Sequence, residues 1–423
     1  MLKSNIAWMK KNVPSDLKVW KGMIQDIDWS QVAAKTKLSL QRDKDRITAE
    51  FKEFAAMDTS AKIDWLMNGD RHLGYLYKKD AIAFARREWK GLKSVGCDFV
   101  GWLKIWGGML NMVMKDPMSI MLAVFEYHWF ASYLATPAVV DRSVFGRRGK
   151  LLQADFDMWV AITHWAEDLI ANLIMADAKI GGNQKINKRI IMFDEMTMAQ
   201  MMAGFPNLLG IPYQMIPVFM VSEMDQLTLI PYIDAIESYG LPSDTCPLPT
   251  AECGCAVKDE YPMCGQGFIA SSMPCDGSVM ATSFQDRRFS KFMPSYPLCM
   301  PVRYDDEDTT EMAAADMKDC IHWVEGLTGE TWNWDTYFAT MEKMNECTRL
   351  EMEKWEINKT HYPQLVGSSF ELFRKWNYEM DGGLFPEGLK TQRKICKTMM
   401  ETYEKKLPAY VGGYEKYRAL IWS

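Results

Sequence analysis

The stretch from Leu241 to Pro301 reads LPSDTCPLPTAECGCAVKDEYPMCGQGFIASSMPCDGSVMATSFQDRRFSKFMPSYPLCMP. It holds six of the ten cysteines of the 423-residue chain, at positions 246, 253, 255, 264, 275 and 299. Thiolates are soft ligands that favour iron–sulfur clusters, zinc or copper(I). We therefore predict a cofactor site in this stretch and a scaffold role for the rest of the chain.

Short apolar segments alternate with helical segments on both sides of these cysteines. The predicted strands are Arg189–Phe193, Gln214–Met220, Gly267–Ser271 and Tyr296–Met300, and the helices between them are Met196–Ala203, Leu227–Tyr239 and Gly277–Phe289. Such alternation indicates a parallel α/β sheet, in which ligands bind beyond the carboxyl ends of the strands. Cys275 lies four residues after Ser271, and Cys299 lies at the end of the fourth strand, so we expect both at this edge.

The fold class that follows is α/β, with the cysteines on a Rossmann-like parallel sheet lobe. We expect helical regions on both sides of this lobe. The predicted units are a helical N-terminal domain at 1–185, the sheet lobe at 186–302, a helical segment at 303–413, and the first strand of an incomplete second lobe at 414–423.

The segment Phe99–Ala135 is the most apolar part of the chain. Its apolar runs are shorter than the roughly 20 residues that a membrane span needs, and charged residues interrupt them. We therefore expect core or subunit-interface helices here rather than a membrane span. The net charge of −6, with acidic and basic residues interspersed, argues against nucleic acid as a partner.

The N-terminus has no apolar run of signal-peptide length, so we expect a cytoplasmic protein. Cysteines of cytoplasmic proteins are seldom paired in disulfides, which leaves metal ligands and buried thiols as their roles. Four cysteines lie in helical patterns, and we interpret them as buried thiols: Cys97, Cys320, Cys347 and Cys396.

The spacing of the six clustered cysteines matches neither the C-x2-C-x2-C run of small ferredoxins nor paired C-x2-C zinc motifs. No histidine lies between 165 and 321, which disfavours a mixed Cys/His site. Cys246 and Cys275 are the strongest candidates, because Pro and Gly neighbours free the backbone at CPLP and MPCDG. The helix after Cys275 adds N–H donors and a positive dipole end for a thiolate-ligated cluster. Asp276 and Ser278 are candidates for hydrogen bonds to cluster or substrate, with helix capping as their alternative role.

At these residues the sequence resembles the iron–sulfur subunits of 2-hydroxyacyl-CoA dehydratases and ATP-dependent benzoyl-CoA reductases, the 2-hydroxyglutaryl-CoA dehydratase D-component type. The resemblance runs from about Lys188 to Trp422, and the first 185 residues have no counterpart. The motifs that carry it are SDTC at 243–246, the A-[DE]-x-G pattern at Ala251–Gly254, MPCDGS at 273–278, PSYPLCMP at 294–301, WVEGLTG at 323–329 and EKYRALIWS at 415–423.

The resemblance implies a [4Fe-4S] or related cluster held by three cysteines. It also implies a homologous or complementary iron–sulfur partner subunit and a separate ATP-dependent iron–sulfur activator that supplies low-potential single electrons. The reactions of the family are 2-hydroxyacyl-CoA dehydration and aryl-CoA reduction. Cys246 matches the first ligand and Cys275 the second. The third ligand of the family comes from a second lobe, so here another polypeptide, Cys264 and Cys299 all stay open.

The chain also departs from the family pattern. Thr197 and Met198 stand where dehydratases often carry an acidic residue, and the nearest one, Glu195, lies slightly earlier. The absence of an acidic residue at these two positions favours an electron-relay or reductase-like role. Cys253 and Cys255 fall at positions that are usually apolar, and extra thiols there fit a larger or altered cluster. Two further functions stay open: an iron–sulfur oxidoreductase of the same fold with a non-CoA substrate, and a non-catalytic assembly or structural subunit.

Overall fold

The structure is a computed structural model that describes residues 25, 28–68, 91–134, 150–194, 199–213, 215–219, 221–222, 226–242, 244–271, 276–299, 301, 306–364 and 386–406. Its α-helices are α2 (Trp29–Ala56), α3 (Thr59–Asn68), α4 (Gly91–Lys115), α5 (Pro117–Glu126), α6 (Phe130–Leu134), α8 (Lys150–Ala176), α9 (Gln184–Asn187), α11 (Ile230–Glu237), α12 (Pro247–Val257), α13 (Asp276–Phe289), α14 (Glu307–Thr328), α15 (Trp334–Asn358) and α17 (Pro386–Glu404). The strands are β1 (Ile190–Phe193), β2 (Leu209–Pro212), β3 (Gly267–Ser271) and β4 (Ser295–Leu298). Three short helices complete the described chain: η2 (Ala199–Gly204), η3 (Met215–Phe219) and η4 (Gln226–Leu229).

The four strands form one parallel sheet in the order β2-β1-β3-β4, which confirms the predicted α/β class. The chain passes from β1 outward to β2, and then crosses back over β1 to β3 and β4. The direction of winding therefore reverses between β1 and β3. In open α/β sheets this topological switch point, at the carboxyl ends of the strands, is where ligands bind.

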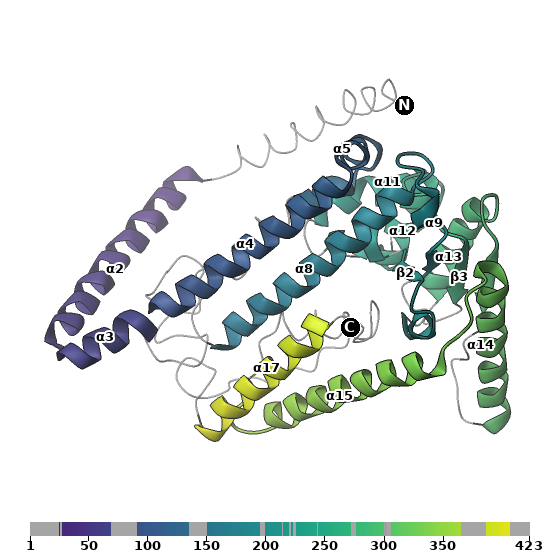
Figure 1. Cartoon of the computed structure of the whole chain (residues 1–423). Coiled ribbons are helices and arrows are strands. Elements are labelled where there is room, and N and C mark those ends of the chain that lie inside the picture. The colour runs from purple at the N-terminus through teal and green to yellow at the C-terminus, as the bar shows by residue number, and fades with distance from the viewer. Residues whose placement is uncertain are drawn as a thin grey trace.

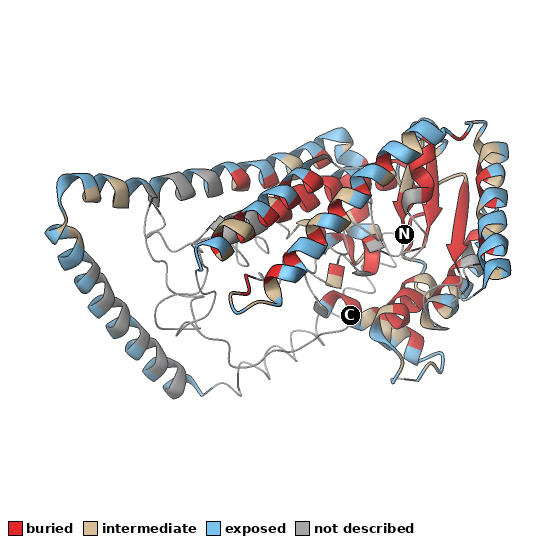
Figure 2. Ribbon diagram, turned by 90° about the horizontal axis from the view of Figure 1, so that it is seen from below, coloured by how far each residue is buried: buried red, intermediate tan, exposed pale blue. Residues whose placement is uncertain are grey.

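Residues of β1 alternate between two apolar layers, as the period of a strand requires. Ile190 and Met192 belong to the layer that also contains side chains of α8 and α12. Ile191 and Phe193 belong to the layer that contains side chains of η2 and α14. Figure 2 shows the strands buried between these layers. Both faces of the sheet are covered, so its ligand-accessible region is the edge where the strands end.

The predicted second strand, Gln214–Met220, is wrong. The strand is β2, and Met215–Phe219 forms the π-helix η3. Pro217 lies inside the predicted range and has no N–H to donate to a sheet ladder. In β2, a Cβ at Gly210 would lie 2.5 Å from the side chain of Met202, so close packing explains the glycine there.

The other predicted strands are confirmed to within two residues at their ends. The helix predicted at Gly277–Phe289 is α13, and that at Leu227–Tyr239 is η4 followed by α11. The helix predicted at Met196–Ala203 is a 3-10 helix in its described part, η2. Helix α12 was not predicted, because its first turn contains Pro247 and Pro249. Proline is tolerated there, since the first N–H groups of a helix have no intrahelical partner.

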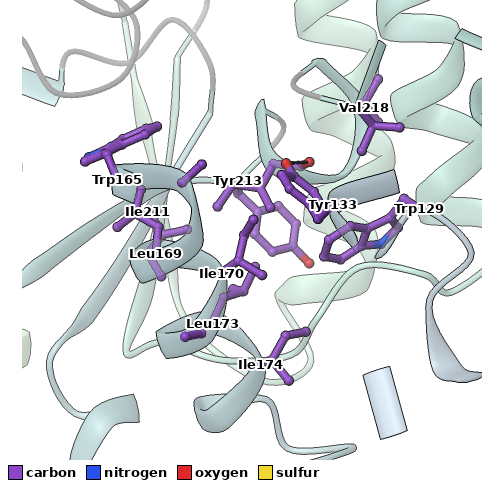
Figure 3. Close-up of a cluster of buried hydrophobic side chains, with 14 of the residues drawn as sticks. Trp129, Tyr133, Trp165, Leu169, Ile170, Leu173, Ile174, Ile211, Tyr213 and Val218 are labelled. Carbon is purple, nitrogen blue, oxygen red and sulfur yellow. Dashed lines mark hydrogen bonds between the residues drawn. The ribbon is translucent and has the colours of Figure 1, made fainter. Parts of the chain in front are cut away.

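The described part of 1–185 is helical, as predicted. Figure 1 shows α4, α8 and α17 running side by side, while α2 and α3 extend away from the rest of the molecule. Figure 3 shows Leu169, Ile170, Leu173 and Ile174 of α8 in one buried cluster with Ile211 of β2 and with Tyr213, which follows β2. None of the described helices is long and apolar enough to cross a membrane.

The described part of 303–413 is also helical. Gly329 caps the end of α14, and its φ of 76° lies in the left-handed region that favours glycine. Part of the predicted helical segment, 365–385 and 407–413, and the predicted strand at 414–423 lie outside the described residues. One apolar core runs from Ile105 of α4 to Met399 of α17, and the domain boundaries stay a prediction.

Candidate functional site

Two polar residues mark the topological switch point of the sheet. Asp194 directly follows β1, and Ser271 is the last residue of β3. The Ser271 N–H donates to Asp194 Oδ2 at 2.5 Å, and the Ser271 hydroxyl donates to Oδ1 at 3.3 Å. Both residues are buried, with exposures of 1% and 4%. The hydrogen bonds fix the separation of β1 and β3 at the edge where the site is expected.

Cys246 is the N-cap residue of α12. Its backbone is extended (φ −51°, ψ 128°), and its carbonyl accepts hydrogen bonds from the N–H and the hydroxyl of Thr250, at 3.3 and 2.8 Å. Its thiol makes no capping bond and is exposed. The thiol is therefore available to a ligand at the positive end of the helix dipole. Pro247 and Pro249 carry no N–H, so the dipole rather than hydrogen-bond donors supplies most of this effect.

The starts of α12 and α13 lie at the same end of the sheet lobe. The chain leaves α12 and enters β3 at its amino end, and α13 begins after the carboxyl end of β3. The two helices pack side by side, with Cys253 and Ala281 in one small buried cluster. Cys253 is seven residues after Cys246, and Ala281 is six residues after Cys275. The helix register therefore places the beginnings of the two helices at about the same level.

The glycine of the A-[DE]-x-G pattern has a packing role. A Cβ at Gly254 would lie 1.9 Å from the carbonyl oxygen of Tyr232, so only glycine allows α12 to approach the backbone of α11 this closely. Ala251 and Glu252 of the same pattern are fully buried. The motif thus positions α12, and with it Cys246, against the neighbouring helix.

Six residues that the sequence analysis singled out are described only in part or not at all. Cys275 lies outside the described residues and directly precedes Asp276, the first residue of α13, in the sequence. Asp276 and Ser278 are in the first turn of α13, where their side chains are not described. Glu195, Thr197 and Met198 also lie outside the described residues. The roles expected for all six stay predictions.

Cys299 lies at the carboxyl edge, as predicted. It follows β4, whose last residue pairs with Ser271 of β3. The Cys299 N–H donates to Asp316 Oδ2 at 2.6 Å, and the Tyr296 hydroxyl donates to Oδ1 of the same carboxylate at 2.7 Å. These bonds hold the end of β4 against α14. The Cys299 side chain is exposed, so its thiol is accessible at the same edge as Cys246.

Cys264 lies at the opposite edge. It precedes the amino end of β3, is 2% exposed, and has its sulfur 3.6 Å from that of Met192. Burial, with a smaller contribution from the Asp177 carboxylate, holds the pKa of the Cys264 thiol well above its ordinary value. The 11 residues of α12 separate Cys246 from this edge by about 16 Å at 1.5 Å per residue. The structure therefore does not bring Cys264 and Cys246 together.

The remaining described cysteines are buried in helices. Burial raises the pKa of Cys253 and of Cys320 to about 12. It likewise raises that of Cys347 to about 11 and that of Cys396 to about 12. Cys255 is also fully buried, on the same helix as Cys253. All of these thiols are buried, as predicted for Cys320, Cys347 and Cys396, and the Cys396 thiol donates to Glu353 Oε2 at 3.2 Å. The Cys97 side chain is not described.

An apolar pocket of about 200 Å³ lies between η2, α14 and the start of α15. The pocket is lined by Met201, Ala314, Met317, Lys318, Ile321, Trp332, Trp334 and Tyr337. The Trp332 indole is 8% exposed and its N–H has no partner in the described structure. The pocket thus offers aromatic walls, one indole donor and one lysine to a flat apolar group with an acceptor atom.

The described donors at the carboxyl edge are soft thiols, which suit iron–sulfur clusters, zinc and copper(I) alike. The accessible side chains there include two thiols, Cys246 and Cys299, and the sequence adds Cys275 directly before α13. Among the described residues no three His, Cys, Asp or Glu side chains form a complete metal site. A cluster held only by residues of this edge thus requires Cys275 as one of its ligands.

Asp194, Ser271 and Trp332 were missed by the sequence analysis. An acidic residue directly after an apolar strand was the available indication for Asp194. Its bond to Ser271 spans 77 positions in the chain, which no local pattern reveals.

The profile of the 2-hydroxyglutaryl-CoA dehydratase D-component family matches residues 226–423. This family is the one that the motifs predict, and the match begins downstream of β2, later than the predicted Lys188. Residues 226–423, slightly less than half of the chain, are therefore similar to this family, which supplies subunits of radical 2-hydroxyacyl-CoA dehydratase-type enzymes. No curated protein matches the chain closely enough to be compared with it.

Proposed function

We propose that the chain is the iron–sulfur subunit of an oxygen-sensitive radical acyl-CoA enzyme. It would take low-potential single electrons from an ATP-driven activator for 2-hydroxyacyl-CoA dehydration or aryl-CoA reduction. The observation that carries the proposal is the exposed Cys246 thiol at the start of α12, a helix that packs against α13 so that the two helices begin at about the same level. The family match covers this whole arrangement except β1 and β2.

In this proposal Cys246, Cys275 and Cys299 hold the cluster. The beginnings of α12 and α13 direct their positive dipole ends toward the thiolates and offset part of their negative charge. Asp194 and Ser271 keep β1 and β3 in place below the cluster. When bound, the cluster supplies reversible one-electron transfer.

The apolar pocket between η2, α14 and the start of α15 is the proposed place for the acyl or aryl group of the substrate. Its aromatic walls exclude water, and the buried Trp332 N–H is a donor for the thioester carbonyl. Lys318 lines the same pocket and is positioned to pair with an anionic part of the substrate. We assign no catalytic acid or base.

Metal analysis after anaerobic purification tests the proposal. The wild-type chain should be brown and contain iron and sulfide in similar amounts. Cys246→Ala should lose most of the iron while keeping its thermal unfolding temperature, since the thiol makes no capping bond. Cys396→Ala is the matched control, because that thiol is buried in α17, and it should keep its iron. Zinc in place of iron, or full iron content in Cys246→Ala, would contradict the assignment.

Acyl-CoA thioesters separate the proposed function from its alternatives. In the proposal, addition of a 2-hydroxyacyl-CoA or an aryl-CoA to the reduced protein changes the EPR signal of the cluster. An iron-containing protein whose signal responds to no thioester would instead be an oxidoreductase of the same fold with a non-CoA substrate. An iron-free protein would be a structural or assembly subunit.

A further inference from the structure

A second cavity lies between α4, α8 and α17, away from the cysteines. Its volume is about 610 Å³, within the range of small-molecule sites. Its lining residues come from all three helices: Lys104, Gly107, Gly108, Asn111, Met112, His164, Trp165, Glu167, Asp168 and Glu387. No motif of the sequence analysis falls in this cavity, and the family match does not include α4 or α8.

Glu167 is the unusual residue of the cavity. Its side chain is 6% exposed, and neither carboxylate oxygen has a hydrogen-bond partner in the described structure. Burial raises the pKa of this carboxyl to about 8. A carboxyl group held in this way without a partner is costly, and it lines a space large enough for a ligand.

The charged neighbours of Glu167 do not neutralise it. On α8, Asp168 pairs with Lys115, and His164 Nε2 makes a 2.6 Å hydrogen bond with the Lys104 carbonyl of α4. The charged residue of α17 at the cavity is Glu387, which is itself acidic. Lys104 of α4 is the lining residue that carries a positive charge, and it forms no bond with Glu167.

Glycine on α4 makes room for the carboxylate. A Cβ at Gly108 would lie 2.0 Å from Glu167 Oε2 and 2.7 Å from the His164 ring. The neighbouring Gly107 would meet nothing within 4 Å. Glu167 thus lies directly against the backbone of α4, and the two glycines form a matched pair for mutation.

We propose that this cavity binds a small aliphatic amine as its ammonium ion, with Glu167 as the counter-ion. An ammonium group supplies both the positive charge and the N–H donors that this carboxylate lacks. Asn111 and Glu387 add further acceptor oxygens, while Met112 and Trp165 line the space for methylene groups. A metal ion fits less well, because no three metal-ligating side chains come together in the part of the chain that the structure describes.

Proton release distinguishes this binding mode from weak surface binding. Glu167 holds a proton at neutral pH and must lose it to pair with the ammonium ion. Binding of 1,4-diaminobutane or butylamine to the full chain at neutral pH should therefore release close to one proton. Titration calorimetry in two buffers of different ionisation enthalpy measures this release. The neutral analogue 1-butanol should not bind.

Glu167→Gln and the two glycine variants test the assigned residue. Glu167→Gln should bind butylamine about tenfold or more weakly and release no proton. Gly108→Ala should weaken binding similarly, because its methyl group displaces the carboxylate, whereas Gly107→Ala should bind as the wild type does. Thermal unfolding confirms that each variant is folded. Absence of amine binding to the wild type, or unchanged affinity in Glu167→Gln, would overturn the proposal, and the iron content of either protein does not bear on it.

Discussion

The Cys299 and Cys264 thiols differ in place and exposure, which leads to opposite expectations for their removal. Cys299 is exposed at the carboxyl edge, and Cys264 is buried at the amino edge. Cys299→Ser should therefore lower the iron content of the anaerobically purified chain and change the EPR spectrum of its cluster. Cys264→Ala should leave both unchanged and cost only stability, about 1 kcal/mol for a small buried side chain. If Cys264→Ala lost iron and Cys299→Ser kept it, Cys264 rather than Cys299 would be the cluster ligand.

Glu167 should make the stability of the chain fall as pH rises. Its pKa is about 8 in the folded chain and 4.5 as a free side chain, so between these values the folded state binds more protons than the unfolded state. The free energy of unfolding therefore decreases from about pH 5 to about pH 8, by up to several kcal/mol at about 1.4 kcal/mol per pKa unit. Urea unfolding across this range measures the slope.

Glu167→Gln is the control for this pH dependence, because glutamine does not titrate. The variant should lose most of the decline and be more stable than the wild type near pH 8. Other groups titrate in both proteins, so only the difference between the two curves reports on Glu167. Parallel curves would show that this carboxyl has an ordinary pKa.

At the scale of secondary-structure elements, the contact between α11 and α12 should depend on Gly254. The added methyl group of Gly254→Ala meets the Tyr232 carbonyl at 1.9 Å, and this atom belongs to a backbone that cannot turn aside. We expect a loss of about 1–3 kcal/mol in the free energy of unfolding and a lower iron content, because α12 carries Cys246. Urea unfolding and metal analysis measure the two effects.

Gly326→Ala is the matched control for Gly254→Ala. Gly326 lies in α14, and a Cβ there meets nothing within 4 Å. Alanine is the better helix former, so this variant should gain about 0.5–1 kcal/mol and keep its iron. Equal stability changes in the two variants would show that helix propensity, not the contact with Tyr232, decides the role of Gly254.

Local sequence patterns predicted the elements whose determinants are local. Short apolar runs predicted the strands β1 and β3. Helix α12 was hidden by Pro247 and Pro249, which break helices everywhere except in the first turn. The position of β2 could not be read, because its packing depends on Met202 and on the β1 side chain Phe193 rather than on its own short sequence.

The candidate site was predictable only as far as its motifs extend. Cys246 was predicted from the SDTC motif. Its position level with the start of α13 follows from the packing of α12 against α13, which the motif does not reveal. Cys264 and Cys299 were equal candidates by sequence, and only the strand topology puts them at opposite edges. The Glu167 cavity could not be predicted, because its residues come from three helices far apart in the chain.

An exposed apolar surface of the described molecule runs along α4 and α5. We call it the α4–α5 face, and its exposed members include Phe99, Leu103, Leu110, Met114, Met118, Met121 and Phe125. The opposite side of α4 is also apolar, with Ile105 and Met112 buried against α8 and its neighbours. A helix that is apolar all round is normally covered on all sides. The described part of a single chain leaves the α4–α5 face open, as the predicted subunit-interface role requires.

The α4–α5 face should make the purified chain self-associate. Exposed apolar patches above a few hundred Å² mark interaction surfaces, and seven side chains exposed by 48 to 64% exceed that size. We expect multi-angle light scattering to give a mass that rises above that of the monomer with concentration. Leu103→Glu combined with Leu110→Glu should restore the monomer without lowering the thermal unfolding temperature, because both side chains are already in water. The matched control is Glu substitution at Leu38 and Phe51 of α2, which are equally exposed but lie on the helix that extends away from the molecule. If the α2 substitutions dissociate the protein and the α4 substitutions do not, the contact between copies lies on helix α2 instead.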